Sequence, residues 1–62
     1  NMNKDMYLVC WCTEEEDHYD VFIDSTSEEN LANAERRYNE LLETEIDLYS
    51  ANICKVVKST DY

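Results

Sequence analysis

Three cysteines and one histidine are the residues of this chain whose side chains could act as a catalytic nucleophile and base or as metal ligands. Cys10 and Cys12 alternate with apolar residues, so they would lie on one face of a strand, and Cys54 comes late in the chain. Together with His18 they could supply a Cys3His zinc site. Structural zinc sites usually set their first pair on a turn, about two to four residues apart, whereas these thiols stand inside an apolar run. We therefore interpret the cysteines as small buried hydrophobes and expect no metal.

Catalysis by these residues is not expected either. A nucleophilic thiol needs a base and an electropositive setting, but His18 sits beside Asp17 and Asp20. Carboxylates are abundant, yet acid–base chemistry needs one of them desolvated in a cleft, which a chain of 62 residues scarcely forms. A disulfide from Cys54 to Cys10 or Cys12 is conceivable across adjacent strands. Three thiols with no charged leader favour a reducing compartment, so we expect a cytoplasmic, non-enzymatic protein without a cofactor.

The composition is dominated by negative charge. Fifteen acidic residues face five basic ones, giving a formal net charge of −10. Apolar residues make up 44% of the chain, too many for a disordered acidic tail, so residues 1–62 are expected to fold as one domain. The charge argues against direct binding of nucleic acid or an anionic membrane, because both repel it. The longest apolar run, residues 6–12, is far too short to span a bilayer.

The spacing of apolar residues predicts two strands, a helix and a third strand. Residues 6–13 and 18–24 are rich in β-branched and aromatic side chains and flank an acidic turn, which is typical of a hairpin. The segment Ser25–Glu29 contains two possible capping boxes, Thr26 with Glu29 or Ser25 with Glu28, at the start of a helix. Along that helix, one side carries an apolar stripe that consists of Leu31, Ala34, Tyr38, Leu41 and Leu42. Residues 49–57 are predicted to form the last strand.

These elements predict an α+β fold, a small ββαβ domain with one helix on one face of a three-stranded sheet. We favour the strand order 2-1-3, mainly antiparallel, because it puts residues 6–13 in the centre, where a strand that is apolar on both faces belongs. The other possibility is that the last strand does not pair with the first but follows a crossover and lies alongside the second, parallel to it.

One helix can cover only one of the two apolar faces of the first strand. One set is Met6, Leu8, Cys10 and Cys12, and the other is Tyr7, Val9 and Trp11. We expect a symmetric homodimer, which would pack sheet against sheet to cover the second face or would complete a sheet through an exposed edge, with Tyr7, Val9 and Trp11 at the contact. The alternative is that Tyr7 and Trp11 stay partly exposed, with their polar atoms in water.

The distribution of acids is the strongest indication of function. Ten of the fifteen lie in the first 35 residues, where only Lys4 opposes them. A row of carboxylates can stand in for nucleic-acid phosphates in a protein groove that normally binds DNA or RNA. We expect a partner-binding surface made of Glu14, Glu15, Glu16, Asp17 and Asp20. An acidic surface that serves only solubility would give the same pattern.

Three segments carry a resemblance to phage proteins. The tyrosine- and valine-rich hairpin, the segment Glu35–Glu45 (ERRYNELLETE) and the segment Leu48–Tyr62 (LYSANICKVVKSTDY) resemble small open reading frames of tailed bacteriophages. The likeness covers most of the chain. Among phage proteins of this size, the chain is similar to inhibitors of bacterial antiviral defence, above all the very short, homodimeric Hachiman anti-defence proteins. Its element order is also similar to that of phage uracil-DNA glycosylase inhibitors that imitate DNA.

Together these observations predict a non-enzymatic phage inhibitor. The resemblance implies a host defence protein as the partner, and the acidic surface favours one that acts on nucleic acid. One alternative is a DNA-mimicking inhibitor of uracil-DNA glycosylase. Another is a structural or regulatory adaptor, which would bind its partner by strand addition at an open sheet edge.

Overall fold

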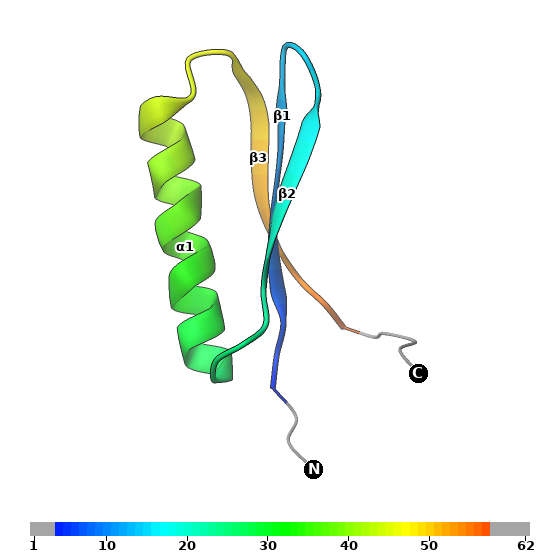
Figure 1. Cartoon of the computed structure of the whole chain (residues 1–62), viewed down its shortest axis with the longest axis vertical. Coiled ribbons are helices and arrows are strands. Elements are labelled where there is room, and N and C mark those ends of the chain that lie inside the picture. Colours follow the sequence, from blue (N-terminus) through cyan, green and yellow to red (C-terminus); the bar gives the residue numbers. More distant parts are fainter. Residues whose placement is uncertain (1–3, 58–62) are drawn as a thin grey trace.

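The computed structural model describes residues 4–57 and has two layers, a three-stranded sheet with one helix across one face (Figure 1). The elements in chain order are β1 (Tyr7–Thr13), β2 (Asp17–Phe22), α1 (Ser27–Thr44) and β3 (Leu48–Lys55). This confirms the predicted α+β fold, with strand bounds slightly shifted from those expected. No helix in this part of the chain has the length and apolar character needed to cross a membrane.

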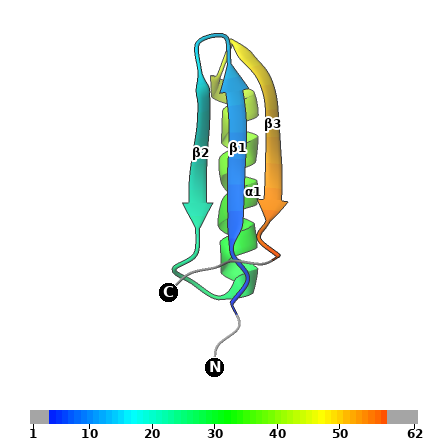
Figure 2. The ribbon, with the colours of Figure 1, turned by 90° about the vertical axis from the view of Figure 1, so that its right-hand side faces the viewer.

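Strand β1 lies in the centre of the sheet. It pairs antiparallel with both neighbours, in the order β2-β1-β3, which confirms the predicted 2-1-3 order. Strands β2 and β3 therefore run parallel to each other with β1 between them. The chain passes from β2 through α1 to β3 by a right-handed crossover, the hand strongly preferred for such connections (Figure 2).

Helix α1 begins where the sequence predicts. Thr26 is the N-cap, and its Oγ1 accepts a hydrogen bond from the Glu29 N–H at 3.1 Å. This bond satisfies one of the backbone donors that a helix leaves open at its start. Glu28 and Glu29 lie in the first turn, where the helix dipole favours negative charge.

Asn30, near the start of α1, is a polar residue that the fold buries, and its side chain is 1% exposed. Its Nδ2 donates to the carbonyl oxygens of Asp5 and Ser25, at 2.9 and 3.1 Å. Its Oδ1 accepts from the Ser25 N–H at 3.1 Å. One buried amide thus ties the chain before β1 and the connection before α1 to the helix, with all its contacts satisfied.

The hydrophobic core lies between α1 and one face of the sheet. Val9 and Trp11 of β1 are buried against Ala34 and Leu41 of α1. Partly buried side chains from all four elements surround these four: Tyr7, Phe22, Tyr38, Leu48, Ala51 and Ile53.

The core corrects two predictions. Tyr7, Val9 and Trp11 were expected to form the dimer interface, but the structure packs them beneath α1, where Val9 is 0% and Trp11 9% exposed. The prediction was wrong because alternation defines two side-chain sets without saying which of them the helix covers. Leu42 was expected in the apolar stripe of the helix, but it is 55% exposed.

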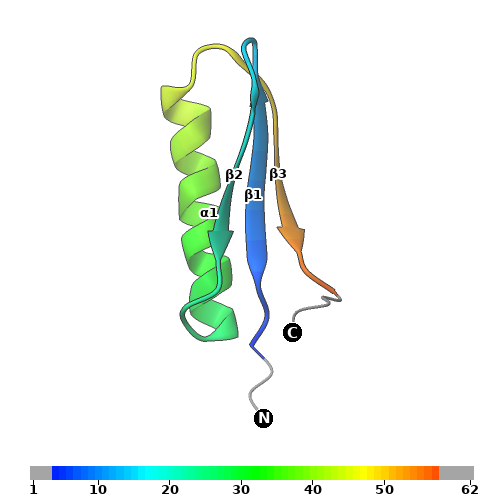
Figure 3. The ribbon, with the colours of Figure 1, turned by 45° about the vertical axis from the view of Figure 1, so that its right-hand side comes forward.

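The face of the sheet turned away from α1 bears the other set of side chains. We call it the open face. It has no covering layer within the part of the chain that the structure describes, as the view in Figure 3 shows. By strand alternation and register it carries Leu8, Cys10, Cys12, Asp17, Tyr19, Val21, Ser50, Asn52 and Cys54.

Candidate functional site

The turn between β1 and β2 presents the acidic residues singled out in the sequence. Thr13 builds this turn: its N–H donates to the Glu16 carbonyl oxygen at 2.9 Å. Its Oγ1 accepts from the N–H groups of Glu15 and Glu16, both at 3.3 Å. The side-chain hydroxyl therefore organises a turn that contains no glycine, and it leaves Glu14, Glu15 and Glu16 exposed.

The connection between α1 and β3 brings further acids to the same end. The Glu14 N–H donates to the Asp47 carbonyl oxygen at 3.2 Å, so the two connections are in contact. Figure 3 shows both at the upper end of the molecule. We define the acidic end as six exposed residues from this region: Glu14, Glu15, Glu16, Asp17, Glu45 and Asp47.

Sequence reasoning missed the contribution of Glu45 and Asp47, although helix length could have indicated it. An 18-residue helix rises about 27 Å. A seven-residue strand spans about 23 Å. Since α1 begins at the end of the sheet opposite the hairpin turn, it must return the chain close to that turn.

Asp20, the fifth predicted partner-binding residue, lies apart from the acidic end. It belongs to the helix-covered face, and its Oδ2 is 2.9 Å from the Arg37 Nε. Arg37 also pairs with Glu40, 2.5 Å away. The structure thus brings Glu14 to Asp17 together and places Asp20 in a separate ion-pair network.

Arg37 links that network to Trp11. Its Cζ lies 5.1 Å from the Trp11 ring centroid, a cation–π contact. The imidazole of His18 stacks on the same indole, with centroids 5.2 Å apart and an interplanar angle of 15°. The hydrogen bonds to Asp20, and then to Glu40, raise the pKa of Arg37, so this guanidinium stays charged. This cluster fastens the helix to the edge of β2.

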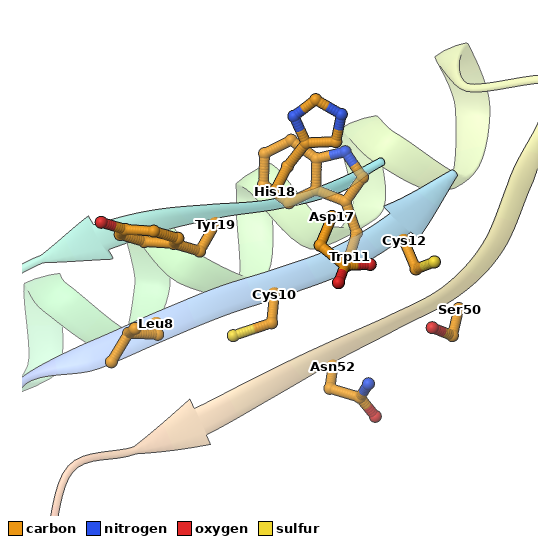
Figure 4. A pocket seen from close by; sticks show the side chains of 9 residues that line it. All are labelled: Leu8, Cys10, Trp11, Cys12, Asp17, His18, Tyr19, Ser50 and Asn52. Atoms are coloured by element: carbon orange, nitrogen blue, oxygen red, sulfur yellow. The ribbon is translucent and has the colours of Figure 1, made fainter. Parts of the chain in front are cut away.

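The three cysteines share the open face, and Cys10 and Cys12 line a shallow hollow of about 540 Å³ there (Figure 4). Burial first, and then the neighbouring Cys54 thiol, raises the pKa of Cys10. A hydrogen bond to the Asp17 carboxylate is the main cause that raises the pKa of Cys12. A raised pKa favours the protonated form of both thiols, whereas a nucleophile requires a lowered one.

Neither the hollow nor the rest of residues 4–57 brings together three metal-ligating side chains in a geometry that could hold an ion. The three cysteines are free thiols. His18, the fourth candidate ligand, points to the helix-covered face and stacks on Trp11, so the sheet separates it from the thiols. The residues that suggested chemistry in the sequence thus lie on opposite faces of the sheet.

Comparison of the chain with models of protein families, with curated proteins and with solved structures finds no match.

Proposed function

We propose that this chain is a non-enzymatic bacteriophage protein that inhibits a bacterial antiviral defence system by binding one of its protein components. It would act in the cytoplasm of the infected cell, and Hachiman is the first system to test. The observation that carries this proposal is the acidic end. Six exposed carboxylates gather there from two connections and the start of β2, and neither connection contains a lysine or arginine.

Charge indicates the kind of surface the acidic end would bind. A cluster of carboxylates repels phosphates and is attracted to lysine and arginine side chains, so it suits a protein surface that itself binds nucleic acid. Many components of antiviral defence must contact nucleic acid to act on it. The lysines of residues 4–57 lie at the other end of the molecule, where Lys55 pairs with Asp5 at 3.5 Å, so they leave the acidic end unneutralised.

The stability of the helix gives a second line of support. The last turn of α1 contains no basic residue, although the negative end of the helix dipole favours one. Glu43 and the C-cap residue Glu45 stand there instead. A carboxylate at this position typically destabilises a helix by about 0.3–1 kcal/mol. Helix stability therefore does not account for these acids, and binding of a basic partner would account for them.

The test is rescue of phage infection. Bacteria carrying a Hachiman system are expected to become permissive to a sensitive phage when the chain is expressed. The double variant Glu15→Gln/Glu16→Gln should lose most of this rescue. The matched control is Glu28→Gln/Glu29→Gln, which removes the same charge at the opposite end and should retain it. Equal loss in both variants would contradict a role specific to the acidic end.

Failure of rescue with Hachiman, and with each of a panel of other defence systems, would refute the anti-defence proposal. Where a target is found, binding of the purified proteins should weaken steeply between about 50 and 300 mM salt, because exposed charges are screened over this range. Binding that is indifferent to salt would favour the adaptor alternative, in which contact is made by strand pairing.

A further inference from the structure

The outer edge of β3 carries backbone groups that the sheet leaves unpaired. The Val56 N–H donates to the Met6 carbonyl oxygen at 3.0 Å, so the backbone of Val56 faces β1. Backbone groups of successive strand residues point alternately to the two sides. Asn52 and Cys54 therefore also face β1, whereas Ala51 and Ile53 direct their N–H and C=O groups outward. No strand within residues 4–57 pairs with this edge.

Side-chain charge distinguishes this edge from that of β2. Residues 48–54 contain no charged side chain, although the chain has a formal net charge of −10. Strand β2 is shorter and carries Asp17 and Asp20. Charged residues on edge strands are a common protection against pairing with other chains, and a long uncharged edge is a site where such pairing occurs. Edge β3 lacks this protection.

We propose that β3 pairs antiparallel with β3 of a second copy of this chain, which joins the two sheets into one of six strands. Each copy has a formal net charge of −10, but the charges at the two ends of β3 are complementary between two copies that pair antiparallel. Antiparallel pairing puts the two acidic ends at opposite ends of the assembly. It also brings Lys55 of each copy toward the Glu45–Asp47 connection of the other.

The position of α1 is compatible with this pairing. The helix runs behind the middle of the sheet, over β1 and β3 (Figure 2). With strands about 4.8 Å apart, the two β1 strands lie about 14 Å apart in the joined sheet, and helices placed between β1 and β3 lie about 10–14 Å apart. Packed helices need only about 8–10 Å between their axes, so the two helices fit on the same side of the joined sheet. The two open faces then form one continuous surface.

The self-association proposed here does not depend on the proposed inhibitor function, and its test uses the purified chain alone. Sedimentation velocity at protein concentrations of about 10 µM to 1 mM should show a monomer–dimer equilibrium, because a modest interface gives a dissociation constant in this range. Asn52→Lys places like charges near each other across the seam and should weaken the dimer at least tenfold. This variant lowers the net negative charge, so greater overall repulsion could not explain the loss.

Val21→Lys is the matched control, because it adds the same charge to the open face on the other edge strand and should leave the dimer intact. A dimer lost with Val21→Lys but kept with Asn52→Lys would overturn the proposal in favour of face-to-face packing or β2 pairing. A wild-type chain that stays monomeric at about 1 mM would also overturn it.

Amide hydrogen exchange provides a direct readout on the wild-type chain. In the dimer the outward N–H groups of Ala51 and Ile53 should be protected, and dilution should remove their protection while that of Val9 remains. Unprotected Ala51 and Ile53 amides at a concentration where sedimentation detects dimer would place the interface elsewhere and overturn the proposal.

Discussion

The two faces of the sheet share the same central strand and differ in what covers them. On the helix-covered face, Val9 is 0% exposed and packs with Trp11 against α1. On the open face, Tyr19 and Val21 of β2 are 67% and 47% exposed. The residues on both sides of β1 are apolar, so composition alone does not make a core. The helix makes one face the core and leaves the other available for contact.

The same contrast separates stability from binding in this small domain. Among residues 4–57, the fully or nearly buried apolar side chains come from two elements, β1 and α1. Domains of about 60 residues are marginally stable, so each core residue carries a large share of the free energy of unfolding. The open face and the acidic end lie outside this core, and they can change with less effect on folding.

The largest expected effect is a loss of stability in Leu41→Ala. Leu41 is fully buried, and removing such a side chain typically costs about 2–5 kcal/mol, enough to unfold a domain of this size. Leu42→Ala is the matched control one residue later, and it should change the free energy of unfolding by less than about 0.5 kcal/mol, because Leu42 is exposed. Urea denaturation followed by circular dichroism measures both. Similar losses for the two variants would show that Leu42 is buried in solution, as in a dimer that covers the helix.

The sequence predicted the fold because its local signals agree with one another. The capping box at Thr26, the helix stripe through Ala34 and Leu41 and the apolar character of residues 6–13 all lead to the observed 2-1-3 sheet. What it could not decide was the side of β1 that meets the helix. That depends on the hand of the crossover together with the pleat of β1. The side chains of β1 are apolar on both faces, so their pattern does not distinguish one face from the other.

The candidate site was predictable only in part, because its residues come together through tertiary contacts. Glu14 to Asp17 are consecutive, so the sequence alone places them in one turn. Asp47 joins them only through the return of the chain along α1. Asp20 is close to them in sequence, but strand alternation turns it to the other face, where Arg37 neutralises it. Counting acidic residues along the sequence therefore includes some that are neutralised in the fold, such as Asp20, and omits others that join the surface, such as Asp47.

A smaller effect is expected at the rim of the helix-covered face. Arg37→Met removes the ion pair with Asp20 and the contact with Trp11, which together are worth about 1 kcal/mol because the pair is partly exposed. Arg36→Met removes the same charge one residue earlier, where the guanidinium bonds Asn33, and should cost less than about 0.5 kcal/mol. The two midpoints of urea unfolding measure the difference. Equal midpoints would mean that the Arg37 cluster does not fasten the helix in solution.

The smallest effect is chemical and concerns the open face. Asp17→Asn removes the carboxylate whose hydrogen bond raises the pKa of Cys12, so that pKa should fall toward its ordinary value. A lower pKa increases the thiolate fraction at pH 8, and the thiolate is the form that reacts with iodoacetamide. Mass spectrometry of the modified protein should therefore show faster alkylation of Cys12 in the variant. Cys10 is the internal reference, because burial and Cys54 raise its pKa. An unchanged ratio of the two rates would mean that Asp17 does not reach Cys12 in solution, and that the open face is arranged differently near the acidic end.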